Sequence, residues 1–575
     1  MNSRNVIIIF LLILLISTGL RFYGLHYGLG YIGDTQNISE AMDIGESVRR
    51  GNLDAFSSPV KYPFITPYLI LFVHGIWFLA GKLTGGFSSI SNFIQYTVLN
   101  PDVSFLISRI ISIFFGILII PLAFYTTGKL ARKLELPKPE IAALSAAFFS
   151  AFNLLLFHFG KFERPHIIAG FALLLAYYLY LFFTEWPSAW RALLLGLSIG
   201  FAAGILQNGF LAGVFLLIPL FNKKILGEKI SRLKFLVFSG VGSLFLIFIS
   251  YPYLFLSFVK TFGGAGGFDI ALSGGAHDVS SFNGQGFYQI AHGLLVYDPV
   301  LLIVALAGLI IFWKKKILAR LIKGCNYGGI VYLTVFVIIF GLYSFTPPRF
   351  LIPLEIMMII LSGIAVAVIY NSASSSPLKY PVQIIGVIFG AFILLQDLRL
   401  ISILTLPDTR KMATDWIVGN VSASEPLLED RQILDILPTK DGIKANELSG
   451  LVKTASRHNR ILLSIEDKKY PPSARYLLYD WYFKIGDYPE FLKEKRVSYI
   501  VLSSGDGFMR DKTHLFEYAN NNLDLRAVFS PFGDTYNGRT SSFPGDFYNP
   551  FKELWLNEQY GPEIRIYSTD IVSKK

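Results

Sequence analysis

The stretch SRIISIFFGILIIPLAFYTTGKLARKL, residues 108–134, decides the fold class of this chain. No charged side chain stands between Arg109 and Lys129, and the apolar run 105–127 reaches the roughly 20 residues that a helix needs to cross a membrane. Basic residues follow at once in the loop GKLARKLELPKPE, residues 128–140. An apolar run that ends in a basic loop predicts a membrane-spanning helix whose loop lies in the cytoplasm.

The composition of the whole chain predicts many such helices. Of its 575 residues 53% are hydrophobic and only 16% are charged, whereas a water-soluble domain has about 25% charged residues. The mean hydropathy is +0.51. The formal net charge of +11 is concentrated in short loops between apolar runs, which argues against a nucleic-acid partner. We therefore expect a polytopic integral membrane protein.

Apolar runs of spanning length recur through residues 1–404. They lie at 5–23, 105–127, 141–159, 166–184, 233–257, 291–313, 328–346, 349–370 and 381–403. Residues 190–221 predict two short spans interrupted at Gln207-Asn208-Gly209. The run 64–80 either lies on or dips into the membrane from the outer face, or crosses it together with a weak span near 85–99. We expect about 11 crossings in the first case and about 13 in the second.

Loop charge orients the predicted bundle. The loops 128–140, 222–234 and 313–324 hold most of the loop lysine and arginine, so we expect them in the cytoplasm. The alternate loops, 160–165 and 258–290, are poor in basic residues and should lie outside. The same alternation places residues 405–575 outside a cytoplasmic membrane.

Residues 405–575 differ in character from the rest of the chain. Charged residues return, and the β-branched stretches VSYIVLSS (497–504) and EIRIYST (563–569) predict strands near a helix at 410–420. We expect a soluble α/β domain. The predicted fold is thus mainly α, a transmembrane helix bundle of about 11–13 spans with a C-terminal extracytoplasmic α/β domain.

The first external loop, residues 24–63, contains the stretch YIGDTQNISEAMDIGESVRRGN (31–52). Apolar residues at helical spacing predict an amphipathic surface helix here; they are Ile38, Ala41, Met42, Gly45 and Val48. Asp34 has two interpretations. It can cap this helix through free backbone N–H groups, or, as a carboxylate directly after a span, it can accept a proton from an alcohol.

The order of these features resembles the GT-C type of polytopic glycosyltransferases that use lipid-phosphate sugars, including the protein O-mannosyltransferases and the aminoarabinose transferase that acts on lipid A. The resemblance covers essentially the whole chain and rests on loose motifs: GDTQNISEAMDIGESVRRGN (33–52), KYPFITPYLILF (61–72), the stretch 108–134 quoted above, KFERPHIIAGFALLLAYYLYL (161–181), SFTPPRFLIPLEIMMIILSGIAV (344–366) and DTRKMATDWIVGN (408–420).

The resemblance implies the roles of several residues. Asp34 matches the aspartate of the family's first external loop, the general base. This chain has Asp34-Thr35 where the family often has Asp-Glu, which leaves the acceptor and any divalent metal undecided. His166 stands where relatives commonly have an acidic residue, and Gln207-Asn208 where they often have a lysine. Neither of these roles can therefore be copied from the family.

Such enzymes transfer a sugar from a polyprenyl-phosphate donor to a hydroxyl of a glycan, lipid or protein, so cations must stabilise the departing phosphate. The candidates for substrate binding are Lys61, Tyr62, Arg109, Arg164, His166 and Arg349. The lysine and the arginines also have a structural interpretation, because lysine and arginine at span ends commonly act as interfacial anchors. Arg164 can pair with the neighbouring Glu163, and His166 can be a neutral interior hydrogen-bonder.

Two other functions stay open at this point. A transporter or flippase of lipid-linked saccharides would use interrupted helices, as the break at Gln207-Asn208-Gly209 permits. A membrane-anchored binding or assembly protein would work through residues 405–575. For a metal site, His277 and Asp278 supply only two adjacent ligands, so the sequence supports none.

Overall fold

The structure is a computed structural model, and it describes residues 3–29, 35–57, 62–226, 229–256, 282–324, 326–374, 376–429, 433–449, 457–480, 485–504, 513–532 and 550–569. The chain forms two compact units. We name the first the bundle unit (Met1–Leu25, Asp34–His74, Ile107–Leu398) and the second the sheet unit (His26–Gly33, Gly75–Leu106, Arg399–Lys575). The predicted fold class is confirmed, because the first is helical and the second holds a β-sheet.

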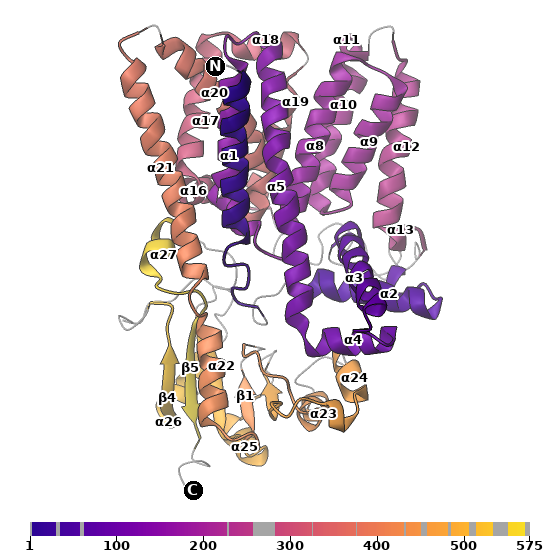
Figure 1. Ribbon diagram of the computed structural model, residues 1–575, viewed down its shortest axis with the longest axis vertical. Coiled ribbons are helices and arrows are strands. Elements are labelled where there is room, and N and C mark those ends of the chain that lie inside the picture. The colour runs from indigo at the N-terminus through magenta and orange to yellow at the C-terminus, as the bar shows by residue number, and fades with distance from the viewer. Residues whose placement is uncertain are drawn as a thin grey trace. The chain divides into compact units, whose positions relative to one another are not determined.

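The bundle unit is built from helices (Figure 1), three of which continue into the sheet unit. Those three are α3 (Ile65–Leu83), α5 (Pro101–Lys133) and α21 (Lys379–Leu404). The others are α1 (Ser3–Phe22), α2 (Thr35–Arg50), η1 (Asp54–Phe56), α6 (Pro139–Phe152), α7 (Leu154–Phe159), α8 (His166–Glu185), α9 (Ala189–Ala203), η2 (Gln207–Gly213), α10 (Val214–Phe221), α11 (Lys223–Leu226), α12 (Arg232–Ser250), α13 (Pro252–Leu256), α16 (Gln285–Tyr297), α17 (Pro299–Lys314), α18 (Ile317–Lys323), α19 (Gly328–Leu342), η4 (Pro348–Leu351) and α20 (Ile352–Ala373).

Seven helices in the described ranges are long and apolar enough to cross a membrane, and two bent helix pairs raise the number to nine. Three shorter apolar helices lie at Pro139–Phe152, Ala189–Ala203 and Gln207–Phe221. The expected 11–13 spans therefore require the shorter helices to be counted as well. The predicted interruption of 190–221 is confirmed, because the 3-10 helix η2 separates α9 from α10.

The expectation of one continuous span at 291–313 is wrong. Helices α16 and α17 meet at an angle of 114°. Asp298 separates them, and Pro299 is the first residue of α17. Proline has no N–H group and is tolerated at a first helical position, where the preceding helix has already ended.

The three basic loops lie together at one end of the bundle unit, which we name the basic end. Arg320 donates from Nη1 to the carbonyl of Leu134 at 2.9 Å. Asn222 donates from Nδ2 to the hydroxyl of Tyr327 at 3.2 Å. Figure 1 shows α11 and α18 at the same end. The sequence placed these loops on one side of the membrane, and their proximity agrees with that interpretation.

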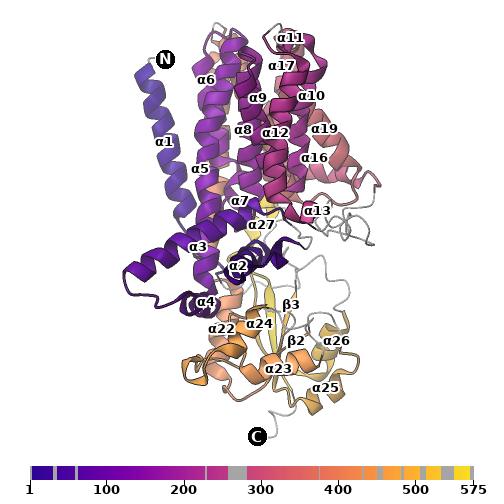
Figure 2. The ribbon, with the colours of Figure 1, turned by 90° about the vertical axis from the view of Figure 1, so that its right-hand side faces the viewer.

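The ambiguous run 64–80 forms the helix α3, which is long and apolar enough to cross a membrane. Figure 2 shows that α3 runs crosswise to α5 and α8. The predicted surface helix of the first loop is α2, which ends where Gly51 takes a φ of 68°. Glycine reaches this left-handed conformation without a steric penalty, so it commonly terminates helices.

Helices α9 and α12 pack through small residues. A Cβ atom at Gly196 would lie 2.0 Å from the carbonyl oxygen of Ser239. A Cβ atom at Gly242 would lie 2.6 Å from the carbonyl oxygen of Leu193. Ser243 donates from Oγ to the carbonyl of Gly196 at 3.0 Å. Small residues let the backbones of neighbouring membrane helices approach this closely.

The sheet unit has a five-stranded mixed sheet in the order β2-β1-β3-β5-β4. Strands β1 and β2, and β1 and β3, are parallel, whereas β5 is antiparallel to β3 and β4. Its strands are β1 (Leu427–Glu429), β2 (Leu477–Tyr479), β3 (Tyr499–Ser504), β4 (Asp524–Phe529) and β5 (Glu563–Ser568). The helices of this unit are α4 (Ile90–Leu99), α22 (Thr409–Asn420), α23 (Lys440–Leu448), α24 (Arg457–Ser464), η5 (Asp467–Lys469), α25 (Tyr488–Glu494), α26 (Thr513–Asn522) and α27 (Pro550–Leu556).

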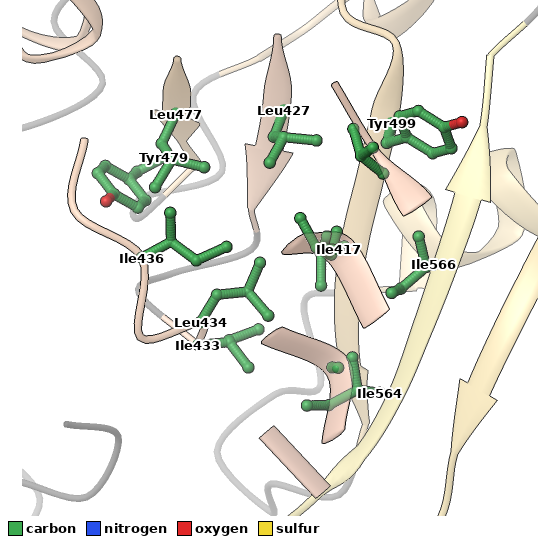
Figure 3. Close-up of a cluster of buried hydrophobic side chains, with 13 residues drawn as sticks. Ile417, Leu427, Ile433, Leu434, Ile436, Leu477, Tyr479, Tyr499, Ile564 and Ile566 are labelled. Atoms are coloured by element: carbon green, nitrogen blue, oxygen red, sulfur yellow. The ribbon is translucent and has the colours of Figure 1, made fainter. Parts of the chain in front are cut away.

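Side chains of successive strand residues pack in two hydrophobic cores, one on each face of the sheet. Leu427 and Ile566 pack with Ile417 of α22 on one face (Figure 3). Leu428 and Tyr567 belong to a second core on the other face. This alternation follows from the two-residue period of a strand, and it confirms the strands and the helix predicted in residues 405–575.

Replacing Gly196 by valine will destabilise the bundle unit, because the new side chain forces α9 away from α12. Overpacking typically costs about 1–3 kcal/mol. We expect a lower unfolding temperature in detergent for Gly196→Val. The control is Gly240→Val on α12, where a Cβ atom has no neighbour within 4 Å. An equal loss of unfolding temperature in both variants would contradict the role of Gly196 in the close packing of α9 against α12.

Candidate functional site

The helix that begins at Pro139 breaks at Asn153, and buried side chains bind the polar groups exposed by the break. Asn153 has φ −64° and ψ 123°, so α6 ends there and α7 starts in a new direction. Arg21 of α1 donates from Nη2 to the carbonyls of Ser150 and Ala151 at 3.3 and 3.2 Å. Inside an apolar bundle each unsatisfied carbonyl costs several kcal/mol, so a buried arginine is favoured here.

The N–H groups on the other side of the break are bound by an acid. The carboxylate of Asp298 accepts hydrogen bonds from the backbone N–H groups of Leu154 and Leu155, at 3.0 and 3.2 Å. Asn153 accepts from Leu156 N–H through its own Oδ1 at 2.8 Å. Asp298 is also the residue at the bend between α16 and α17. One carboxylate therefore joins the two interruptions of the bundle unit.

The end of α1 is held by Lys161, in the turn that follows α7. Its Nζ donates to the backbone carbonyls of Arg21 and Tyr23. Burial lowers the pKa of Lys161 to about 7, with the nearby Arg21 guanidinium acting in the same direction. Asp397 of α21 offsets part of this effect, because its carboxylate lies close to both cations. Lys161 thus fixes the position of the turn 160–165.

Arg109 and Glu163 form an ion pair with both side chains fully buried. Arg109 Nε lies 2.9 Å from Glu163 Oε2, and its Nη1 donates to the carbonyl of Leu25 at 2.9 Å. Glu163 therefore pairs with Arg109 of α5, 54 residues away in the sequence. The contacts of Arg109 are those of a residue that orders the turn.

His166 and Arg349 both lie against one aromatic ring. The imidazole of His166 stacks on Phe350 with centroids 5.9 Å apart and an interplanar angle of 22°. The guanidinium carbon of Arg349 lies 5.5 Å from the centroid of the same ring. We name these three residues the cation–ring group. His166 is buried, whereas Arg349 is partly exposed.

The cation–ring group lies at the end of the bundle unit away from the basic end. Helix α8 starts at His166 and ends at Glu185, whose carboxylate pairs with Lys129 of the first basic loop. A helix of 20 residues rises about 30 Å. Two residues predicted from widely separated stretches, His166 and Arg349, are therefore brought together about one membrane thickness from the basic loops.

The remaining predicted residues have different positions. Arg164 is partly exposed in the turn 160–165, and its carbonyl accepts from Ser112 Oγ at 3.4 Å. Tyr62 is buried ahead of α3. Asp34 and Lys61 fall outside the described residues, although α2 begins directly after Asp34. Their proposed roles stay predictions.

Several charged residues of the bundle core were missed by the sequence prediction of a site. Arg21, Asp298, Glu355 and Asp397 are all buried. Each lies within an apolar run of the sequence, and an ionisable residue inside a span is itself a sign of a special role. Glu355 of α20 faces Asp298 and Asn153. Within the described ranges, no cluster of three or more His, Cys, Asp or Glu residues fits a metal ion.

Two solved structures align with most of the chain. ArnT from Cupriavidus metallidurans bound to undecaprenyl phosphate has 10% sequence identity and a TM-score of 0.46, and the alignment covers 98% of each chain. Archaeal oligosaccharyltransferase AglB from Archaeoglobus fulgidus, in complex with an inhibitory peptide and a dolichol-phosphate, has 13% identity and a TM-score of 0.42 over 93% of this chain and 75% of that chain. No protein-family model and no curated protein matches the chain. At this level of similarity no residue role carries over.

Glu163→Gln will destabilise the bundle unit, because it leaves the buried guanidinium of Arg109 without its counter-charge. Breaking a buried pair in this way costs about 3–5 kcal/mol. The free energy of unfolding in mixed micelles measures the loss. The double variant R109M/E163L replaces both charges by apolar side chains and should recover much of the stability.

The control for the buried pair is Glu46→Gln, which breaks the ion pairs with the exposed Arg49 and Arg50 on the surface helix α2. Pairs of this kind contribute little, so the control should have almost no effect on the free energy of unfolding. An unaffected Glu163→Gln variant would contradict the structural role of the buried pair.

Proposed function

We propose that this chain is an integral membrane glycosyltransferase that transfers a sugar from a polyprenyl-phosphate donor to a hydroxyl acceptor. The observation that carries the proposal is the cation–ring group, because it places a partly exposed arginine at the end of the bundle that the loop charges orient away from the cytoplasm. The resemblance of the sequence to the GT-C glycosyltransferases supports the same reaction. The acceptor is a glycan, lipid or protein of the outer face.

The reaction requires stabilisation of the leaving phosphate. As the bond to the anomeric carbon breaks, negative charge accumulates on the phosphate oxygens, and a guanidinium group binds such oxygens with charge-assisted hydrogen bonds. Arg349 and Arg164 are both partly exposed, so a lipid phosphate can reach them. His166 positions Arg349 through the shared ring of Phe350. Tyr62 and Lys61 are proposed to bind the donor as well.

The reaction also requires a base that removes the proton of the acceptor hydroxyl. We assign this role to Asp34, which directly precedes α2. The competing interpretation is that Asp34 only caps this helix. The two differ in their consequences, because loss of a cap costs stability and loss of a base costs rate.

Arg109 has a different role from the other candidates for donor binding. The sequence predicts that it contacts the donor, but its side chain is buried and binds Glu163 and the carbonyl of Leu25. We therefore favour a positioning role for Arg109, in which it holds the turn that carries Arg164.

A transporter of lipid-linked saccharides is the second candidate. Interrupted helices with buried ionisable groups are typical of transporters. Asp298 stands at the bend between α16 and α17, and the buried carboxyl groups of Glu355 and Asp397 interact electrostatically with it. Asp298, however, binds backbone N–H groups across the break at Asn153, and Glu355 faces Asp298 and Asn153. We therefore favour transfer over transport. An assay distinguishes the two activities, because transfer forms a new glycosidic bond and transport does not.

Asp34→Asn will remove sugar transfer while the protein stays folded. Loss of a general base lowers the rate by about 10²–10⁴-fold. The measurement is complementation of a deletion strain, in which mass spectrometry follows the lipid-linked sugar that accumulates without transfer. Asp54→Asn is the matched control, because Asp54 is an exposed carboxylate of the same loop. Wild-type transfer by a folded Asp34→Asn variant would exclude Asp34 as the base.

Arg349→Gln will slow transfer without changing the fold, because its guanidinium is partly exposed and lies over Phe350. Losing one charge contact to the leaving group typically costs about 10²–10³ in rate. Partial recovery in Arg349→Lys would support a charge role. Lys379→Gln removes an exposed cation elsewhere on the bundle unit and should leave transfer unchanged. Equal rates for Arg349→Gln and wild type would remove Arg349 from the site.

A further inference from the structure

A groove of about 790 Å³ opens at the basic end of the bundle unit, far from the residues proposed for transfer. Its walls come from α10, the start of α12 and the first turns of α19. The wall residues are mostly apolar: Val214, Leu217, Ile218, Phe221, Val331 and Val335. Leu217 and Phe221 are more than half exposed. Pockets that hold small organic ligands have volumes of about 300–1,000 Å³, so the groove has the size of a ligand site.

The rim of the groove is polar and positively charged. Lys224 and Arg232 line it, and both side chains are exposed. Asn222 and Tyr327 also line it and are joined by a hydrogen bond of 3.2 Å. Among the described residues that line the groove, none is acidic. The surface therefore combines an apolar channel with two cations at its mouth.

The first turn of α12 adds to the positive potential at the rim. Arg232 is the first residue of this helix, and Ser231 caps it by accepting from Lys234 N–H at 3.2 Å. The N-terminus of a helix carries a partial positive charge that favours anions. Arg232 thus presents its guanidinium beside a helix end of the same sign. An anion at the rim would be stabilised by both.

We propose that this groove binds an anionic phospholipid of the leaflet at the basic end, with one acyl chain against the apolar walls and the phosphate at Lys224 and Arg232. Basic pockets between membrane helices on the cytoplasmic side recognise anionic headgroups in this way. The apolar walls fit a hydrocarbon chain, because α10 and α19 are apolar helices of the bundle that expose side chains at the groove. The site is independent of the proposed transfer activity.

The polyprenyl-phosphate donor is a different lipid and does not suit this groove. His166 and Arg349 lie at the other end of the bundle, and the 20 residues of α8 separate the two ends by about 30 Å. A donor whose phosphate lay at Arg232 could not present its sugar to those residues. A soluble peptide is also a poor occupant, because the groove is bordered by helices apolar enough to face lipid.

The test is lipid retention by the full-length chain purified in detergent. The protein is mixed with equal amounts of phosphatidylglycerol and phosphatidylcholine, and native mass spectrometry counts the lipids that stay bound. We expect one phosphatidylglycerol to be retained in preference to phosphatidylcholine. The double variant Lys224→Gln/Arg232→Gln should weaken this preference by about 10-fold or more, since each cation contributes about 1 kcal/mol.

Two further variants keep the result decisive. Lys314→Gln/Lys315→Gln removes two exposed cations from the same end of the bundle but outside the groove lining, and it should retain phosphatidylglycerol. Val331→Phe fills the groove without changing the charge, and it should no longer retain the lipid. This variant tests the groove independently if the charge variant folds poorly. Equal retention of both phospholipids by the wild type, or an equal loss of phosphatidylglycerol in the control variant, would overturn the proposal.

Discussion

The bundle depends on one constraint, which is that every backbone polar group exposed by a broken helix must be bound inside the protein. Lipid tails offer no hydrogen bonds, so a break within a span needs side chains that replace the lost backbone hydrogen bonds of the helix. At Asn153 this need is met from two directions. Arg21 binds the carbonyls that end α6, and the Asp298 carboxylate binds the N–H groups that begin α7. The guanidinium of Arg21 and the carboxylate of Asp298 thus stabilise the fold together with the apolar packing around them.

This constraint connects the core of the bundle to its proposed site. Because α7 is short and capped, the chain turns at 160–165 and starts α8 at His166. Lys161 and the Arg109–Glu163 pair fix that turn against α1 and α5. In the proposed site the buried charges act as positioning residues, and the partly exposed Arg164 and Arg349 are the residues that we propose to contact the phosphate. A site built on capped helix ends is more rigid than one carried by a long loop.

The sequence predicted the elements whose signal extends over many residues. Helix α5, the surface helix α2, the gap at Gln207 and the strands β3 and β5 follow from the periodicity and composition of their own segments. The contacts that decide the site could not be predicted in the same way. Glu163 pairs with Arg109, which lies 54 residues away in the sequence. Asp298 lies inside an apolar run, and a hydropathy average over that run does not reveal a single carboxylate. Such pairings depend on the tertiary arrangement, which only the structure provides.

The proposed reaction forms a glycosidic bond and consumes a polyprenyl-phosphate sugar. The most direct measurement reconstitutes the purified chain in vesicles with the lipid extract of cells that lack it, and follows polyprenyl phosphate by mass spectrometry. We expect release of the unsubstituted polyprenyl phosphate, with the sugar gained by an acceptor hydroxyl. Movement of the lipid across the bilayer with its sugar still attached, and with no polyprenyl phosphate released, would contradict it.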